Sequence, residues 1–120
     1  MNSNFESFEN DVMRTILENK FEEIDILKEQ YRNSQVLKRE FTGCGFFSNF
    51  IVNDIEKKLR FENYNMKLSC LGELEGVKDG VGFILFIKDG FIDFLEGYTY
   101  GNEAWPEEIR KYKLYRSTQW

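Results

Sequence analysis

The feature that most constrains the fold is a pair of apolar runs, residues 81–88 and 91–98, separated only by Asp89-Gly90. This dipeptide is typical of a type I′ turn, in which both central residues need a positive φ. The pattern therefore predicts a β-hairpin. In residues 81–88 both faces of the predicted strand are apolar, so we expect that strand to be central, with both sides of the sheet covered.

Residues 8–32 contain no Gly or Pro, and their apolar residues recur at spacings of three to five, which is a helical pattern. Glu18-Asn19-Lys20 is a credible break, so one long helix or two shorter ones both remain open. After residue 34 the period changes to two. Further strands are predicted at residues 36–42, 46–52, 66–71 and 112–117. In the first of these, Leu37 and Phe41 share one face, while Lys38 and Glu40 share the other.

A chain of 120 residues with 42% hydrophobic and 17% aromatic residues is expected to form a single domain with one core. We predict an α+β fold in which residues 1–34 form a helical region and residues 35–120 form mainly a curved antiparallel sheet of about five or six strands. The helical region is expected to pack on the sheet.

Composition excludes several classes of function. Histidine is absent, which removes the commonest general base and metal ligand, and the two cysteines form no metal-binding pattern. We expect no catalytic residue, no metal and no cofactor. A net charge of −5 is the wrong sign for a nucleic-acid or anionic-membrane surface. The longest apolar run is too short to span a bilayer and the first residues are polar, so we expect a cytoplasmic protein.

Residues 89–108 carry a net charge of −6 and contain no Lys or Arg, whereas the other hundred residues sum to +1. The same stretch holds Tyr98, Tyr100 and Trp105, which are residue types that dominate binding interfaces. Acidic and aromatic residues together predict a basic partner. The alternative is a solvated loop whose aromatic residues complete the core. The acidic residues are Asp89, Asp93, Glu96, Glu103, Glu107 and Glu108.

Two other hypotheses remain. One is a small-ligand binding domain whose pocket lies between helix and sheet, lined by Phe46, Phe50, Phe83 and Phe94. The other is an enzyme that uses Glu96 with a tyrosine. Asp93 and Glu96 lie three apart on a predicted strand and so point to opposite faces, which argues against a catalytic carboxylate pair.

Two segments resemble a family of small acidic bacterial proteins that carry GxGFFxxF and LEGxTYG…WP segments. They are residues 43–52, GCGFFSNFIV, and residues 80–106, which contain GVGFILF and LEGYTYGNEAWP. Proteins of this size and acidity resemble the immunity proteins of contact-dependent growth-inhibition and polymorphic-toxin systems. The resemblance covers about the last two-thirds of the chain, and it implies a cytoplasmic inhibitor that binds a cognate toxin.

A toxin that cleaves nucleic acid presents a basic cleft, which an acidic, aromatic surface can cover after fast electrostatic association. We therefore expect an immunity protein that neutralises a toxin, with a nuclease as the expected kind of toxin and neither nucleic acid nor membrane as a direct partner. The oligomeric state remains open. In this hypothesis the glutamates mimic phosphates and the aromatic residues form the desolvated centre. The expected partner-binding residues are Glu96, Tyr98, Tyr100, Glu103, Trp105, Glu107 and Glu108.

Overall fold

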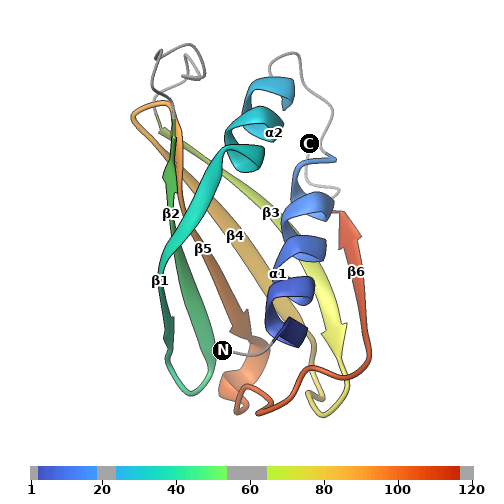
Figure 1. The fold of residues 1–120 in the computed structure, drawn as a ribbon. Coiled ribbons are helices and arrows are strands. Elements are labelled where there is room, and N and C mark those ends of the chain that lie inside the picture. Colours follow the sequence, from blue (N-terminus) through green and yellow to red (C-terminus); the bar gives the residue numbers. More distant parts are fainter. Residues whose placement is uncertain (1–2, 19–23, 54–64, 117–120) are drawn as a thin grey trace.

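In the described part of the chain, two helices precede a six-stranded antiparallel sheet, which confirms the predicted α+β class (Figure 1). The computed structural model describes residues 3–18, 24–53 and 65–116. α1 ends at Ile16 and is followed by a turn at Leu17 and Glu18, so the helical region forms two helices and not one. Residues 19–23 and 54–64 lie outside the described residues. The elements are α1 (Ser3–Ile16), α2 (Ile24–Arg32), β1 (Ser34–Phe41), β2 (Gly45–Val52), β3 (Asn65–Leu74), β4 (Val81–Lys88), β5 (Phe91–Thr99), the short 3₁₀ helix η1 (Tyr100–Asn102) and β6 (Tyr112–Arg116).

The strand order is β1-β2-β5-β4-β3-β6, so β1 and β6 form the two edges. The predicted hairpin is β4 and β5, joined by Asp89 and Gly90 with φ of 53° and 85°, as a type I′ turn requires. As expected, β4 is an interior strand, with β5 and β3 as its neighbours. This arrangement places the aromatic-rich second half of the chain across the middle of the sheet.

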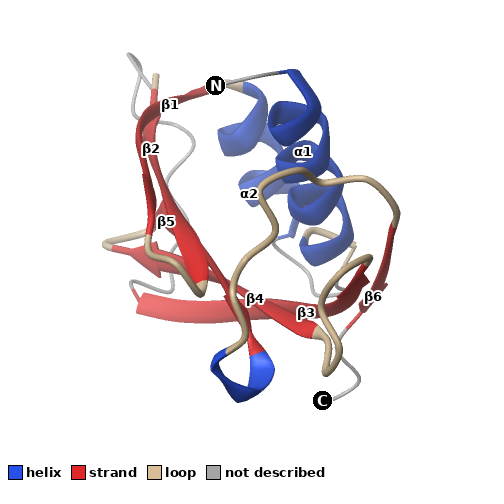
Figure 2. Ribbon diagram, turned by 90° about the horizontal axis from the view of Figure 1, so that it is seen from below, coloured by secondary structure: helices blue, strands red, loops and turns tan. Residues whose placement is uncertain are grey.

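The sheet curves around the two helices, which lie against the same face (Figure 2). We call this face the inner face and the opposite one the outer face. The apolar stripe of α1, including Phe8, Val12 and Ile16, is fully buried and packs with Phe46 and Phe83 from the sheet. Burying a side chain of this size stabilises the fold by about 1.5–3 kcal/mol. The core therefore lies between helices and sheet.

The described helices do not cover the outer face. Along β4, Phe83, Leu85 and Ile87 are buried towards the helices, whereas Ile84 and Phe86 point outward and are only half-buried. Within the described part of the chain, no helix or strand packs on them, so the prediction that both sides of the sheet are covered is wrong here. Apolar neighbours on the outer face shield one another instead.

Strand β1 also differs from its sequence pattern. A bulge between Val36 and Lys38 shifts the register against β2 and leaves Leu37 70% exposed, so Leu37 is not part of a half-buried face. Beyond the bulge the alternation holds: Lys38 and Glu40 lie on the outer face, and Phe41 pairs with the buried Phe46.

Candidate interaction surface

A row of aromatic rings crosses the outer face from β2 to β4. Phe94 of β5 lies between Phe47 of β2, with ring centroids 5.9 Å apart, and Phe86 of β4, which stacks on it at 4.3 Å. The ammonium of Lys67, on β3, lies 5.3 Å from the centre of the Phe86 ring. Offset stacks and cation–π contacts of this kind stabilise the row by about 0.5–1.5 kcal/mol each. The row is a preformed apolar platform.

Glu96 lies beside this row, near the middle of the sheet. Its cross-strand neighbours are Phe47 on β2 and Ile84 on β4, and Phe94 and Tyr98 flank it on the same face of β5. The side chain is half-buried, yet nothing in the described part of the chain donates a hydrogen bond to it or forms an ion pair with it. This carboxylate among rings therefore offers its oxygens to a group from outside the protein.

Tyr98 and Tyr100 extend the surface towards η1. Their rings meet edge to face at 5.4 Å. Burial raises the pKa of Tyr98 to about 12, helped by its hydrogen bond with Tyr100 and by the nearby Glu96 carboxylate, so the phenol stays protonated. Tyr98 packs directly over Gly82: a Cβ there would come 2.5 Å from its hydroxyl oxygen. The missing side chain at Gly82 is what lets the Tyr98 ring lie flat on the sheet.

Glu103 is engaged within the protein. Its two carboxylate oxygens accept hydrogen bonds from the backbone N–H groups of Lys78 and Asp79, both at 2.8 Å. These two bonds hold the pKa of Glu103 below its ordinary value. Glu103 thus ties the β3–β4 loop to the segment after η1, rather than presenting a free negative charge.

Trp105 contributes to the core. It is half-buried, its ring lies 5.3 Å from that of Phe46 and 6.2 Å from that of Phe8, and its backbone N–H donates to the carbonyl of Gly43 at 2.7 Å. For this residue the alternative interpretation, an aromatic side chain that completes the core, describes the packing.

Glu107 and Glu108 lie elsewhere again. With Asn4 and Phe5 they line a hollow of about 60 Å³ beside the start of α1. Glu108 also forms an exposed ion pair with Arg110 at 3.1 Å. These two glutamates are therefore associated with the helical side of the molecule, away from Glu96.

The acidic residues of 89–108 do not form one continuous surface. Asp89 lies in the turn before β5 and Glu103 lies beyond the other end of that strand. Nine strand residues at about 3.3 Å each separate the two ends by about 30 Å. Of the seven residues expected to bind a partner, the structure brings together Glu96, Tyr98 and Tyr100 on the outer face.

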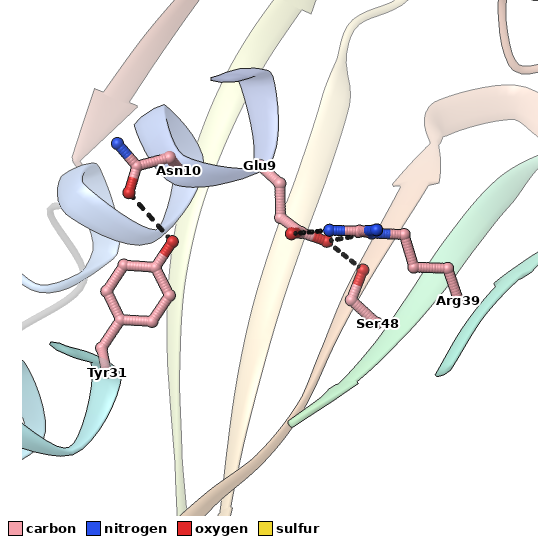
Figure 3. A network of polar contacts seen from close by, with 5 residues as sticks. All are labelled: Glu9, Asn10, Tyr31, Arg39 and Ser48. Atoms are coloured by element: carbon pink, nitrogen blue, oxygen red, sulfur yellow. Dashed lines mark hydrogen bonds and ion pairs between the residues drawn. The ribbon is translucent and has the colours of Figure 1, made fainter. Parts of the chain in front are cut away.

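The inner face holds a buried polar network that was not predicted from the sequence (Figure 3). Glu9 of α1 is only 3% exposed; its carboxylate accepts two hydrogen bonds from Arg39 of β1, at 2.7 and 3.0 Å, and one from the hydroxyl of Ser48 on β2. The hydrogen bond with Glu9 is the main reason that the pKa of Arg39 is raised. The sequence does contain a signal for the burial of Glu9. Glu9 follows Phe5 by four residues and precedes Met13 by four, so it lies within the apolar stripe of the helix.

The hollow spaces also differ from the pocket we expected. Phe46, Phe50 and Phe83 are buried in the core, and Phe94 lies on the other face, so these four rings do not line one pocket. A groove of about 660 Å³ lies instead between α1, α2 and β6. Its lining is largely polar and charged, and includes Asp11, Arg14, Lys28, Tyr31, Arg32 and Tyr112.

Among residues 3–18, 24–53 and 65–116, no three Cys, Asp or Glu side chains are grouped closely enough to hold a metal ion. None of the helices in these ranges is long and apolar enough to cross a membrane. No protein-family model, no curated protein and no solved structure matches the chain.

Proposed function

We propose that this protein is an inhibitor that binds a basic protein through the outer face of its sheet, and that its partner is a toxin, specifically a nuclease. The observation that carries the proposal is Glu96, a half-buried carboxylate without a donor from the described residues, set among aromatic rings on an uncovered sheet face. The resemblance to immunity proteins supports the choice of a toxin.

An arginine from the partner fits this site best. The guanidinium forms two parallel hydrogen bonds with a carboxylate, and its flat surface stacks on aromatic rings such as Phe47 and Tyr98. A buried charged pair surrounded by apolar contacts that exclude water is typical of the energetic centre of an interface. Binding centred on Glu96 would occupy the basic residues with which a nuclease holds its substrate.

Single-stranded nucleic acid is an alternative partner for the aromatic row, because its bases stack on aromatic side chains. Lys67 and Lys88 on the outer face would favour phosphate groups, but a carboxylate at the centre and a net charge of −5 oppose them. Charge therefore favours a basic protein over a nucleic acid.

The experiment uses the protein encoded by the adjacent upstream gene as the partner. We expect binding at nanomolar affinity that weakens with salt, and loss of the partner's toxicity when both proteins are co-expressed. Glu96→Gln removes the charge with little change of shape. We expect it to weaken binding by about 30-fold or more, because the partner's cation is left buried and unpaired.

Glu6→Gln is the matched control, since Glu6 is an exposed carboxylate on α1, on the other side of the sheet. It should bind like the wild type. Equal affinities for Glu96→Gln and the wild type, or tighter binding of single-stranded oligonucleotides than of the upstream gene product, would contradict the proposal.

A small-ligand binding function is the second candidate, and the groove between α1, α2 and β6 favours it. Its volume of about 660 Å³ is within the usual range for ligand sites. Arg14, Lys28 and Arg32 in its lining favour an anionic ligand, whereas the hydroxyls of Tyr31 and Tyr112 already donate to Asn10 and Asp11. If no phosphate or carboxylate metabolite in a thermal-shift screen raises Tm, this candidate fails.

A further inference from the structure

Among the strands of residues 3–18, 24–53 and 65–116, β1 has a partner on one side only, β2. Bonded and non-bonded pairs alternate in an antiparallel ladder. The N–H of Thr42 donates to the carbonyl of Gly45 at 3.0 Å, which fixes the phase of this alternation. Counting back from that pair, the backbone N–H and C=O groups of Phe41 and Arg39 point away from β2, towards the open edge. These groups are available to another strand.

The sequence of this edge is self-complementary about Arg39. When two copies of β1 pair antiparallel around a two-fold axis at that residue, Lys38 of each copy lies opposite Glu40 of the other. Both side chains are exposed on the outer face. Opposite charges in direct cross-strand contact stabilise a sheet, whereas like charges destabilise it.

The same register brings apolar side chains together. Leu37, in the bulge just before Lys38, comes near Phe41 of the other copy, and these two residues are 70% and 47% exposed. Both are among the most exposed large hydrophobic residues of the described chain. The pairing thus removes from water the exposed parts of two apolar side chains.

The two-fold axis also places the Arg39 residues of both copies next to each other, which would be repulsive for free guanidinium groups. Each Arg39 is already neutralised by its own Glu9, at 2.7 Å and largely out of solvent (Figure 3). The buried network therefore makes this register acceptable at its centre.

We propose that β1 is a homodimer interface, in which a second copy of this chain adds its own β1 and extends the sheet across a two-fold axis. Because of the bulge between Val36 and Lys38, regular pairing between the two copies begins at Lys38, so the paired segment is short. The outer face remains open in each copy, so the dimer carries two copies of the surface around Glu96. The inference does not depend on the proposed function.

A charge exchange tests the register. Sedimentation velocity of the full chain over a concentration series should show a monomer–dimer equilibrium. Lys38→Glu and Glu40→Lys each replace the two cross-strand ion pairs of the dimer by like-charge contacts, and each should weaken dimerisation by about 10-fold or more. The double variant Lys38→Glu/Glu40→Lys restores opposite charges at both contacts, and its dimer should return to within about 3-fold of the wild type.

Lys113→Glu is the matched control, because it makes the same charge change on the outer face of the other edge strand, β6. It should dimerise like the wild type. Leu37→Lys should abolish the dimer without changing the circular dichroism spectrum, since Leu37 is exposed in the single chain. A wild type that stays monomeric at millimolar concentration, or a double variant no better than the single ones, overturns the proposal. The affinity for the upstream gene product should be unchanged in Leu37→Lys, which separates this result from a failure at Glu96.

Discussion

Glu9 on α1 and Arg39 on β1, thirty residues apart in the chain, form a two-point ion pair that is almost entirely out of solvent. Ser48 on β2 donates a further hydrogen bond to the same carboxylate. One buried acid thus connects the first helix with the edge strand and with the strand beside it. Because a charge without its partner is costly at such a depth, the pair fixes how helix and sheet dock.

Arg39→Met should destabilise the fold by about 3–5 kcal/mol, because it leaves the Glu9 carboxylate buried without its cation. Urea unfolding followed by circular dichroism measures the loss. The control is Arg32→Ala, which removes an exposed ion pair with Glu29 and should cost less than about 1 kcal/mol. Similar losses for both variants would show that the buried pair has no special role.

Gln30→Met should lower the free energy of unfolding by about 2–4 kcal/mol. The buried Gln30 amide donates to the carbonyl of Gly90 and accepts from the N–H of Ile92, both at 2.8 Å, so it holds the β4–β5 turn against α2. Methionine fills the same space without either bond. Amide exchange at Ile92 should become faster. Exchange at the wild-type rate would mean that the turn does not depend on Gln30.

Gly97→Ala should cost about 1–3 kcal/mol through overpacking. A Cβ at this position would come 2.2 Å from the Phe46 ring, which is completely buried and has no room to move. At Gly82 the corresponding Cβ meets the half-exposed Tyr98, which can swing outward. We therefore expect Gly82→Ala to reduce partner binding more than stability, and thermal unfolding together with calorimetry separates the two effects.

Glu103 makes stability depend on pH in the acid range. Its pKa in the folded protein is lower than the ordinary value of 4.5, so its contribution is present above pH 4.5 and is lost as the pH falls through the folded pKa. Glu103→Gln should flatten the fall in stability below pH 4.5. The control is Glu107→Gln, since Glu107 is exposed and accepts no hydrogen bond from the described part of the chain. If both variants follow the wild-type curve, the bonds to Lys78 and Asp79 are not significant for stability.

Local patterns predicted the elements well. Asp89-Gly90 between two apolar runs specified the hairpin, because few other dipeptides accept two positive φ values. Helical spacing before residue 34 and alternation after it separated α from β. The apolar outward side of β4 was misleading, since rings such as Phe86 and Phe94 cover each other without a further layer.

The candidate site could be predicted only in part. Glu96 and Tyr98, both expected to bind a partner, share one face of β5 because side chains alternate along a strand. The positions of Glu103 and Trp105 depend on the path of the chain after η1. That path brings Glu103 to the backbone amides of Lys78 and Asp79, and it brings Trp105 to the core. Such long-range contacts leave no periodic signal in the sequence.

The isoleucine methyl groups report most directly on which face binds a partner. Ile51 and Ile84 lie on the outer face, whereas Ile16 and Ile87 are buried on the inner side. In methyl NMR spectra of the protein titrated with the upstream gene product, we predict that the signals of Ile51 and Ile84 shift or broaden while those of Ile16 and Ile87 stay in place. Changes confined to Ile16 and Ile87, or none at all, would contradict a partner surface centred on Glu96.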